Sequence, residues 1–456
     1  MFLKKEVRTN KQRFGIALPI ILLTYFMIIL DNSIIFTSTV KIANDLSLNN
    51  QSLSWITNAY ALTFGGLLLF SGKAGDVFGR KRVYLIGLAI FSVSSLLVGL
   101  SNSAAMIISM RAVQGIGSSI LAPSTLALLM DNYSGKMRTK AIGYYGATAG
   151  LGSSFGLVIG GIIASYWSWR VGFFLNFPIG IAMLLLSIKY LRSEKTYAEK
   201  IDILGTIFSI LGISALVYSI DGTNYRGLSL IVAIVSLILF VFQENKSSEP
   251  IMPLTLFKNS ERSFAYLARF AYMGFAVSYF FLTPLAMQRV YGFSPLGSAL
   301  GFLPETIPQF IFAAVETRLS TKISNSKLLI TGMVITFIGV LATAILGIGS
   351  GYVLSIAIPM IFVGIGQAFV LSPLTVSGVS HTTPEMTGSA SGIVNTVHQI
   401  GGSVGLSVVV TLVSRYSNPA MSYNHAMIWI TVLVGIALIF SLGIIIFNNR
   451  KKLKSN

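Results

Sequence analysis

Cysteine is absent from this 456-residue sequence, and histidine occurs only at His381, His398 and His425. Without thiols the chain can form neither a disulfide framework nor a thiolate metal site. No cluster of His, Asp or Glu residues has metal-ligand spacing in the sequence. We therefore expect no metal and no cofactor.

A phosphate-binding loop is also missing. Lys73 follows Gly72, but Leu67 occupies the position of the first glycine in the Gly-x-x-x-x-Gly-Lys-Ser/Thr pattern. This absence argues against ATP-driven pumping, and no catalytic arrangement stands out elsewhere. We expect a protein that is not an enzyme and that draws its energy from an ion gradient.

Charge is scarce as well, at 11% of residues, whereas 54% are hydrophobic. The apolar residues form runs of roughly 17 to 25, the length of a helix that crosses about 30 Å of hydrocarbon. The first run follows basic residues like a signal peptide, but many runs come after it, so we interpret it as a span. The sequence predicts an all-α polytopic membrane protein with spans at about 14–40, 54–72, 83–100, 105–129, 140–165, 170–190, 203–220, 228–243, 263–284, 296–317, 328–348, 353–377, 388–413 and 426–447.

The basic residues are distributed unequally between the two sides of the predicted membrane. Most of the 33 Lys and Arg residues fall on the side of the termini, while the opposite loops hold Lys41, Arg170, Arg226, Arg289 and Arg415. By the positive-inside rule, both termini are predicted to be cytoplasmic. The net charge of +18 then reflects a basic inner face beside anionic lipid. We expect the lipid bilayer, and not nucleic acid, as the partner of this charge.

The segment GKAGDVFGRKR, residues 72–82, concentrates charge and glycine between two apolar runs. Gly72, Gly75 and Gly79 permit a tight turn and close helix approach. Asp76 can accept hydrogen bonds at a helix N-terminus, where the helix dipole favours an anion. Arg80 can pair with an acid at a neighbouring helix end. On charge alone, the segment would be an ordinary basic inner loop.

The spacing of Gly72, Asp76, Gly79 and Arg80 resembles the loop Gly-x-Leu-x-Asp-Arg-x-Gly-Arg-Lys of the major facilitator superfamily. MRAVQGIGSS, which contains Arg111, is similar to the Arg-x-x-Gln-Gly-x-Gly pattern of the same family. WRVGFFLNFPIG and MQRVYGFSPLGSALGFLP are close to segments of its fourteen-span drug:proton antiporters. The resemblance covers nearly the whole chain and agrees with the span count.

A glycine row in the fifth span extends this resemblance. GSSFGLVIGG places Gly152, Gly156, Gly160 and Gly161 as in the antiporter motif Gly-x-x-x-Gly-Pro-x-x-Gly-Gly. The row gives a small-residue face on which two helices can approach closely. Leu157 stands where the motif has Pro, so the bend that in the family helps to seal the helix interface is lost.

The resemblance implies a major facilitator fold. Residues 14–190 and 263–447 would form two six-helix bundles around a central cavity, and residues 203–243 would be two inserted transmembrane helices. It also implies conformational gating at the inner ends of the bundles, with Asp76 near Gly388 and Ser389 and with Arg80 bridging to Asp131. The gating residues on this hypothesis are Gly72, Asp76, Gly79, Arg80 and Asp131.

Charged side chains inside spans are costly and need a partner or water. Asp31 lies about 25 Å along the first span, in its outer half, and Arg111 lies at a similar depth in the fourth span, so the two can pair. Glu305 lies near the midplane between Pro304 and Pro308, which suggests an irregular helix that lines a cavity. We assign Asp31, Arg111 and Glu305 to proton coupling, and Glu305 and Asp31 also to substrate binding.

Each of these residues also has a structural interpretation. Asp31 and Arg111 form either a fixed ion pair or one that opens on protonation. Glu305 is either functional or a protonated acid hydrogen-bonded to a neighbouring helix. Arg269 is interpreted as reaching the inner interface with its long side chain, and His398 as a packing residue on a glycine-rich helix.

These observations favour a monomeric, proton-coupled antiporter in the cytoplasmic membrane of a bacterium. It would export amphipathic, often cationic drugs, such as dyes and quinolone-like antibiotics, by alternating access, so its partners would be small-molecule drugs and protons. The alternative is a specific metabolite carrier or a transporter-like sensor without multidrug efflux, for which Leu157 is the best support. Efflux of ethidium or norfloxacin with and without a proton gradient discriminates between the two.

Overall fold

The computed structural model describes residues 14–191, 202–222 and 224–455, and this part of the chain contains helices and no strand. The first six long helices are α1 (Ala17–Asp45), α2 (Asn50–Phe78), α3 (Arg80–Gly99), α4 (Ala104–Asn132), α5 (Gly135–Tyr166) and α6 (Trp169–Tyr190). Two more follow, α7 (Ile203–Asp221) and α8 (Arg226–Lys246). The remaining helices are α9 (Ser260–Tyr291), α10 (Pro295–Leu300), α11 (Leu303–Leu319), α12 (Asn325–Leu346), α13 (Ile358–Ala368), α14 (Leu371–Gly378), α15 (Pro384–Val413) and α16 (Pro419–Ser455).

Thirteen stretches of the described chain are long and apolar enough to cross a membrane. Each corresponds to one predicted span, so the all-helical membrane fold is confirmed. The remaining prediction, 140–165, falls on α5, a helix of 32 residues whose described apolar part is Phe155–Tyr166.

Two of the spans are broken. The tenth consists of α10 and α11, which are separated at Gly301 and Phe302. Pro304 follows this break at the start of α11, where a missing backbone N–H costs no hydrogen bond. The twelfth consists of a π-helical turn (Val353–Ala357), α13 and α14. The tenth span is therefore irregular, as predicted, but its break precedes both prolines, α11 runs as a continuous helix through Pro308, and the predicted cavity lining at Glu305 is not observed.

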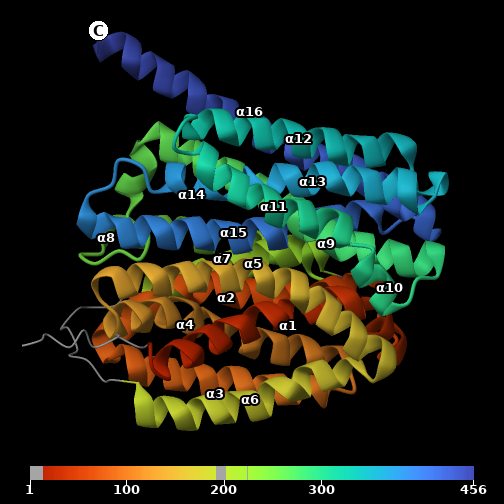
Figure 1. The fold of residues 1–456 in the computed structure, drawn as a ribbon, viewed down its shortest axis with the longest axis horizontal. Coiled ribbons are helices and arrows are strands. Elements are labelled where there is room, and N and C mark those ends of the chain that lie inside the picture. Colours follow the sequence, from red (N-terminus) through yellow and green to blue (C-terminus); the bar gives the residue numbers. More distant parts are fainter. Residues whose placement is uncertain (1–13, 192–201, 223, 456) are drawn as a thin grey trace, which may run out of the picture.

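The helices fall into two groups in space. Figure 1 shows α1–α6 in the lower half and α9–α16 in the upper half, with their axes nearly parallel. Between the groups, α2 packs against α15, α1 against α9, and α5 against α10. Helix α7 touches both groups, because Asp221 accepts hydrogen bonds from Ser54 of α2 at 2.6 Å and from Thr411 of α15 at 3.3 Å.

The outer surface is apolar, as lipid contact requires. On α8, large apolar side chains recur every three or four residues and are exposed, at Leu228, Ile231, Val235, Ile238 and Phe242. This spacing forms one helical stripe, and an exposed apolar surface of this kind marks an interaction with lipid or with another protein.

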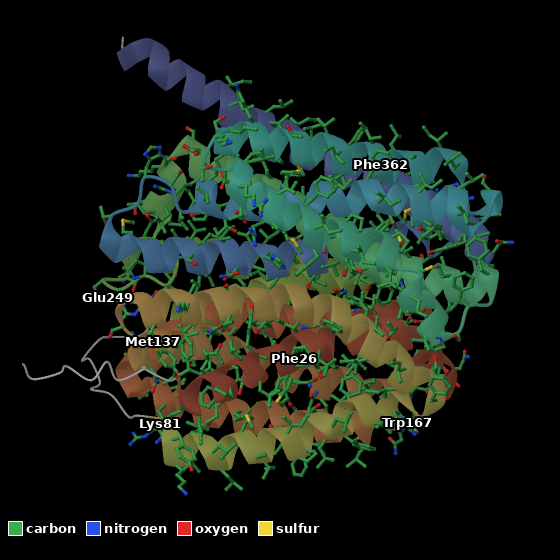
Figure 2. The ribbon with its side chains drawn as sticks, viewed as in Figure 1. Phe26, Lys81, Met137, Trp167, Glu249 and Phe362 are labelled. Carbon is green, nitrogen blue, oxygen red and sulfur yellow. The ribbon has the colours of Figure 1, made fainter. Side chains whose placement is uncertain are left out.

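The two ends of the molecule can be recognised from labelled side chains. Lys81 and Glu249 lie at the left end in Figure 2, whereas Trp167 lies at the opposite end. Phe14 belongs to the left end too, because its carbonyl accepts a hydrogen bond from Tyr133, just after α4. Helix α16 also ends on the left, so Phe14 and the end of α16 lie on the same side (Figure 1).

Candidate functional site

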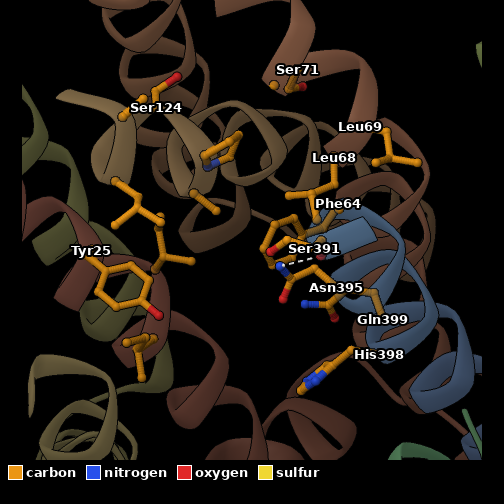
Figure 3. Close-up of a pocket in the computed structure, with 18 of the residues that line it drawn as sticks. Tyr25, Phe64, Leu68, Leu69, Ser71, Ser124, Ser391, Asn395, His398 and Gln399 are labelled. Atoms are coloured by element: carbon orange, nitrogen blue, oxygen red, sulfur yellow. Dashed lines mark hydrogen bonds between the residues drawn. The ribbon is translucent and has the colours of Figure 1, made fainter. Parts of the chain in front are cut away.

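A cavity of about 920 Å³ lies between the two groups of helices. Figure 3 shows side chains from both groups around it, including Tyr25, Phe64, Asn395 and His398. The lining reaches Lys73, Arg80, Met130, Gly388 and Ser389, which stand at the helix ends on the side of the termini. The cavity therefore extends from the middle of the molecule toward this side.

The opposite side is closed by contacts between the two groups. Gln288 of α9 donates a hydrogen bond to the carbonyl of Thr37 in α1 at 3.1 Å. The backbone N–H of Leu296 donates to the hydroxyl of Ser165 at 2.8 Å. A third bond, at 2.8 Å, joins Arg289 to Asn50. The molecule is thus open on one side and sealed on the other.

Three glycines of the predicted row pack α5 against α1. A Cβ at Gly156 would lie 2.6 Å from the Ser33 hydroxyl oxygen, and one at Gly160 would lie 3.0 Å from the Cα of Ile34. At Gly152 the nearest atom, from Ile29, would be 3.1 Å away. The small residues therefore allow the two helices to approach closely, as the motif predicts.

The fourth glycine of the row faces the other half of the molecule. A Cβ at Gly161 would lie 2.7 Å from the Cβ of Ala299 and 3.1 Å from the Cα of Leu296. Gly161 is therefore part of the closed side, where α5 meets α10. Leu157, which replaces the motif proline, lines the cavity, and α5 runs through this position as a continuous helix.

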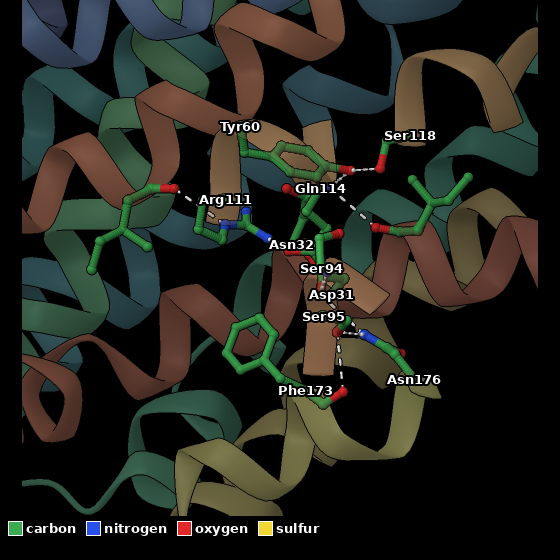
Figure 4. A network of polar contacts seen from close by, with 12 residues as sticks. Asp31, Asn32, Tyr60, Ser94, Ser95, Arg111, Gln114, Ser118, Phe173 and Asn176 are labelled. Atoms are coloured by element: carbon green, nitrogen blue, oxygen red, sulfur yellow. Dashed lines mark hydrogen bonds and ion pairs between the residues drawn. The ribbon is translucent and has the colours of Figure 1, made fainter. Parts of the chain in front are cut away.

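Asp31 and Arg111 form the predicted ion pair, which is buried (Figure 4). The other carboxylate oxygen of Asp31 accepts hydrogen bonds from Gln114 at 2.8 Å and from Asn176 at 3.1 Å. Arg111 also donates to the carbonyl of Ile56 at 3.2 Å. The prediction that Asp31 lies in the outer half of its span is wrong. Helix α1 continues to Asp45, well beyond the predicted end, so Asp31 stands at its midpoint.

A chain of polar contacts connects this pair to the cavity. Asn32 lines the cavity and donates to the hydroxyl of Tyr60 at 3.3 Å. The ring of Tyr60 covers the guanidinium of Arg111, whose central carbon lies 4.2 Å from the ring centroid. This distance is within the range of a cation–π contact. A movement of the Arg111 side chain can thus be passed to the cavity wall through Tyr60 and Asn32.

The segment 72–82 differs in part from its predicted form. Helix α2 continues to Phe78, so Gly72 and Gly75 lie inside the helix and not in a turn. A Cβ at Gly72 would meet nothing within 4 Å, so this glycine makes no close helix contact while the side of the termini is open, and its role in gating stays a prediction. The turn is at Gly79, whose φ of 94° suits a residue without a side chain.

The predicted contact between Arg80 and Asp131 is present, with 2.5 Å between a guanidinium nitrogen and a carboxylate oxygen. It joins the start of α3 to the end of α4. The side chain of Asp76 lies outside the described residues, so its predicted position beside Gly388 and Ser389 stays a prediction. Both of these residues line the cavity near Arg80.

Glu305 is fully buried in the first turn of α11, and neither carboxylate oxygen has a hydrogen-bond partner within the described part of the chain. Its backbone packs against α13, because a Cβ at Gly364 would lie 2.1 Å from the Glu305 carbonyl oxygen. Glu305 is not among the described residues that line the cavity. Its roles in proton coupling and substrate binding stay predictions.

Arg269 differs from its sequence interpretation. It does not extend to the membrane interface but lines the cavity, with 6% of its surface exposed. Its guanidinium donates to the hydroxyl of Thr375 at 2.9 Å and to the carbonyl of Leu371 at 3.3 Å. The Nδ1 atom of His398 lies 3.1 Å from another guanidinium nitrogen. His398 therefore has a polar partner at the cavity wall and is more than a packing residue.

Sequence reasoning missed several members of these networks. Asn176 stands in the motif segment that follows the fifth span, which was a usable signal. Tyr60, Asn32 and Thr375 carry no such signal, because a Tyr, Asn or Thr within an apolar run is compatible with many environments.

Comparison with known proteins agrees with this architecture. Residues 21–406 match the family profile of the Major Facilitator Superfamily. The cephamycin export protein CmcT of Amycolatopsis lactamdurans is 31% identical over 437 residues, which cover 92% of this chain and 90% of that protein. The multidrug transporter protein MdtP of Bacillus subtilis is 30% identical over 91% of this chain and 78% of its own length.

Solved structures show the same fold at lower identity. The POT family transporter PepTSo has a TM-score of 0.73 and 13% identity, covering 97% of this chain and 99% of its own. A bacterial homologue of the human lysosomal transporter Spinster, in an inward-facing and unoccupied conformation, has a TM-score of 0.71 and 15% identity over 95% of this chain and 98% of its own.

Proposed function

Because the chain belongs to the Major Facilitator Superfamily, we propose that it is a proton-coupled antiporter that exports amphipathic drugs by alternating access. Relatives named for drug or antibiotic export span most of its length. The observation that supports the proposal best is a cavity of about 920 Å³ that is open on one side only, with the buried carboxylate of Asp31 three contacts away from the lining residue Asn32. The protein would act as a monomer in the bacterial cytoplasmic membrane, with both termini and the open side cytoplasmic.

The proposed transport cycle exchanges the open and closed sides. Residues 14–190 and 263–447 would move as two bundles, with the pair at 203–243 between them. Opening the far side requires the contacts of Gln288, Leu296 and Arg289 with the first group to break. These hydrogen bonds, each worth about 1 kcal/mol net, would be lost together with the packing of α5 against α10.

Asp31 is the proposed site of proton coupling. Its carboxylate is held by Arg111 and by two side-chain amides. A proton on Asp31 removes the charge that Arg111 faces, and the ion pair then loses most of its attraction. Because Asn32 follows Asp31 on α1 and lines the cavity, this change reaches the substrate site.

The preference for cationic drugs is a separate part of the prediction, and it depends on Glu305. The cavity lining gives it no support, because Glu305 is not among the described lining residues. We keep this preference as a prediction for mutagenesis.

Proteoliposomes that contain the purified protein test the proposed function. With an imposed pH gradient, ethidium or norfloxacin should move against its own gradient in exchange for protons. Collapse of the gradient with a protonophore should stop this movement. Binding or movement of neither compound in any condition would favour a metabolite carrier or a sensor, and uphill movement that survives the protonophore would contradict proton coupling.

A further inference from the structure

Arg269 is unusual among the cations that line the cavity, because it has no acidic partner in the described part of the chain. Among the described lining residues, the other two cations are paired. Arg80 contacts Asp131 at 2.5 Å, and Lys73 lies 3.6 Å from Glu249. Arg269 is bound only by neutral groups, and its Nε atom is buried without a hydrogen-bond partner among the described atoms.

Arg111 offers a comparison within the same chain. Both arginines lie in predicted spans and are buried, but Arg111 faces Asp31 whereas Arg269 faces Thr375 and His398. A buried cation without a counter-charge is costly. The cavity next to Arg269 is the place from which a counter-charge can arrive.

The neighbours of Arg269 fix its orientation and add a donor. A guanidinium has only donors, so the Nδ1 atom of His398 must accept, and the proton of the neutral ring is then on Nε2. Thr375 accepts from another guanidinium nitrogen. His398 itself lines the cavity (Figure 3), so an anion there meets an arginine and an imidazole N–H.

We propose that Arg269, with His398 beside it, is a subsite for the carboxylate of an amphipathic substrate. The subsite rests on the proposed export function and adds to it a preference for compounds that carry a carboxylate, whether acids or zwitterions. No acidic side chain stands among the described lining residues to compete for Arg269. The guanidinium nitrogen beside His398 has a second N–H that is not used by Thr375, Leu371 or His398, and a hydrogen bond from a charged donor to a carboxylate is about twice as strong as one between neutral groups.

Matched pairs of ligands that differ only in the carboxylate test the subsite. Norfloxacin and its ethyl ester form one pair, and rhodamine B and its ethyl ester form a second. Their equilibrium affinities are measured with the full-length protein in nanodiscs without any ion gradient. We expect wild type to bind at least one acid about tenfold tighter than its ester, the usual size for a hydrogen bond to a charged group.

The variants then assign the preference to a residue. Arg269→Gln should lose the tenfold preference because its affinity for the acid falls. Its affinity for the ester should stay unchanged, which would show that the cavity is intact. Arg269→Lys should keep part of the preference, since it keeps the charge without the guanidinium. Arg138→Gln is the control for net charge, because Arg138 is not among the described lining residues.

Three results would overturn the subsite. In the first, wild type shows no preference for either acid over its ester, which includes wild type that binds none of the four compounds. In the second, the Arg269→Gln variant keeps the preference. In the third, this variant loses affinity for acid and ester equally, which would make Arg269 a structural residue. The binding assay needs no proton gradient. Failure of the export function therefore appears separately, as preferred binding of the acid without uphill transport.

Discussion

Replacement of Gly161 by alanine should shift the balance between the two states of the molecule. The added Cβ would lie 2.7 Å from the Cβ of Ala299 and 3.1 Å from the Cα of Leu296. Carbon atoms in contact are normally about 3.5 to 4.0 Å apart, so α5 and α10 must separate by about 1 Å. Overpacking of this kind costs about 1–3 kcal/mol. The cost applies only while this side is closed.

The size of the effect follows from this cost. Each 1.4 kcal/mol changes the ratio of two states about tenfold, so the ratio of the open to the closed form of this side should rise by about fivefold to a hundredfold. Ser298, which is fully buried here and bonded to Gln288, should then become more accessible. The chain has no cysteine, so a Ser298→Cys substitution introduces its single thiol.

The assay is the labelling rate of that thiol by a membrane-impermeant maleimide applied from the closed side. Gly143→Ala is the matched control, because it lies on the same helix and its Cβ would meet nothing within 4 Å. Both variants gain the same helix propensity, about 1 kcal/mol. We expect labelling to be about tenfold faster for Gly161→Ala than for the control. Equal rates would refute the view that Gly161 permits closure.

Three further predictions concern the acidic residues. Asp31→Asn should abolish uphill efflux but leave downhill exchange, because it removes the exchangeable proton; a variant that still concentrates drug outward in a flux assay would make the ion pair structural. Asp76→Asn should weaken transport more than membrane insertion, measured as efflux per inserted protein, and wild-type efflux would remove Asp76 from conformational gating. Glu305→Gln should lose the efflux of cationic dyes but keep the efflux of a zwitterionic quinolone, as measured by dose–response curves. Equal loss of both would assign Glu305 to proton coupling, and no loss of either would leave it a structural residue.

The span order could be predicted because it depends on the lengths of the apolar runs. The ion pair could be predicted because an acid and a base inside spans have a strong reason to pair. The estimated depth of Asp31 was wrong, since α1 extends to Asp45. The predicted ends were less accurate, since α1 and α2 continue as helices beyond their apolar runs to Asp45 and Phe78.

The surroundings of Arg269 could not be predicted in the same way. A long side chain near the inner end of a span usually reaches the interface. Here Thr375 and His398 come from α14 and α15, more than 100 residues further along the chain. Only the three-dimensional packing of these helices shows that they offer partners inside the cavity. The same holds for Tyr60, which reaches Arg111 from α2.

The two flanks of the molecule differ, because the helices α7 and α8 cover only one of them. On one flank, α7 spans the seam between α2 and α15, and α8 turns an apolar stripe outward. On the other flank, α5 meets α10 and α11 with no inserted helix packed against this seam in the described chain. A compound dissolved in the bilayer would therefore meet the extra helices α7 and α8 on one flank and only the seam between α5 and α10 on the other.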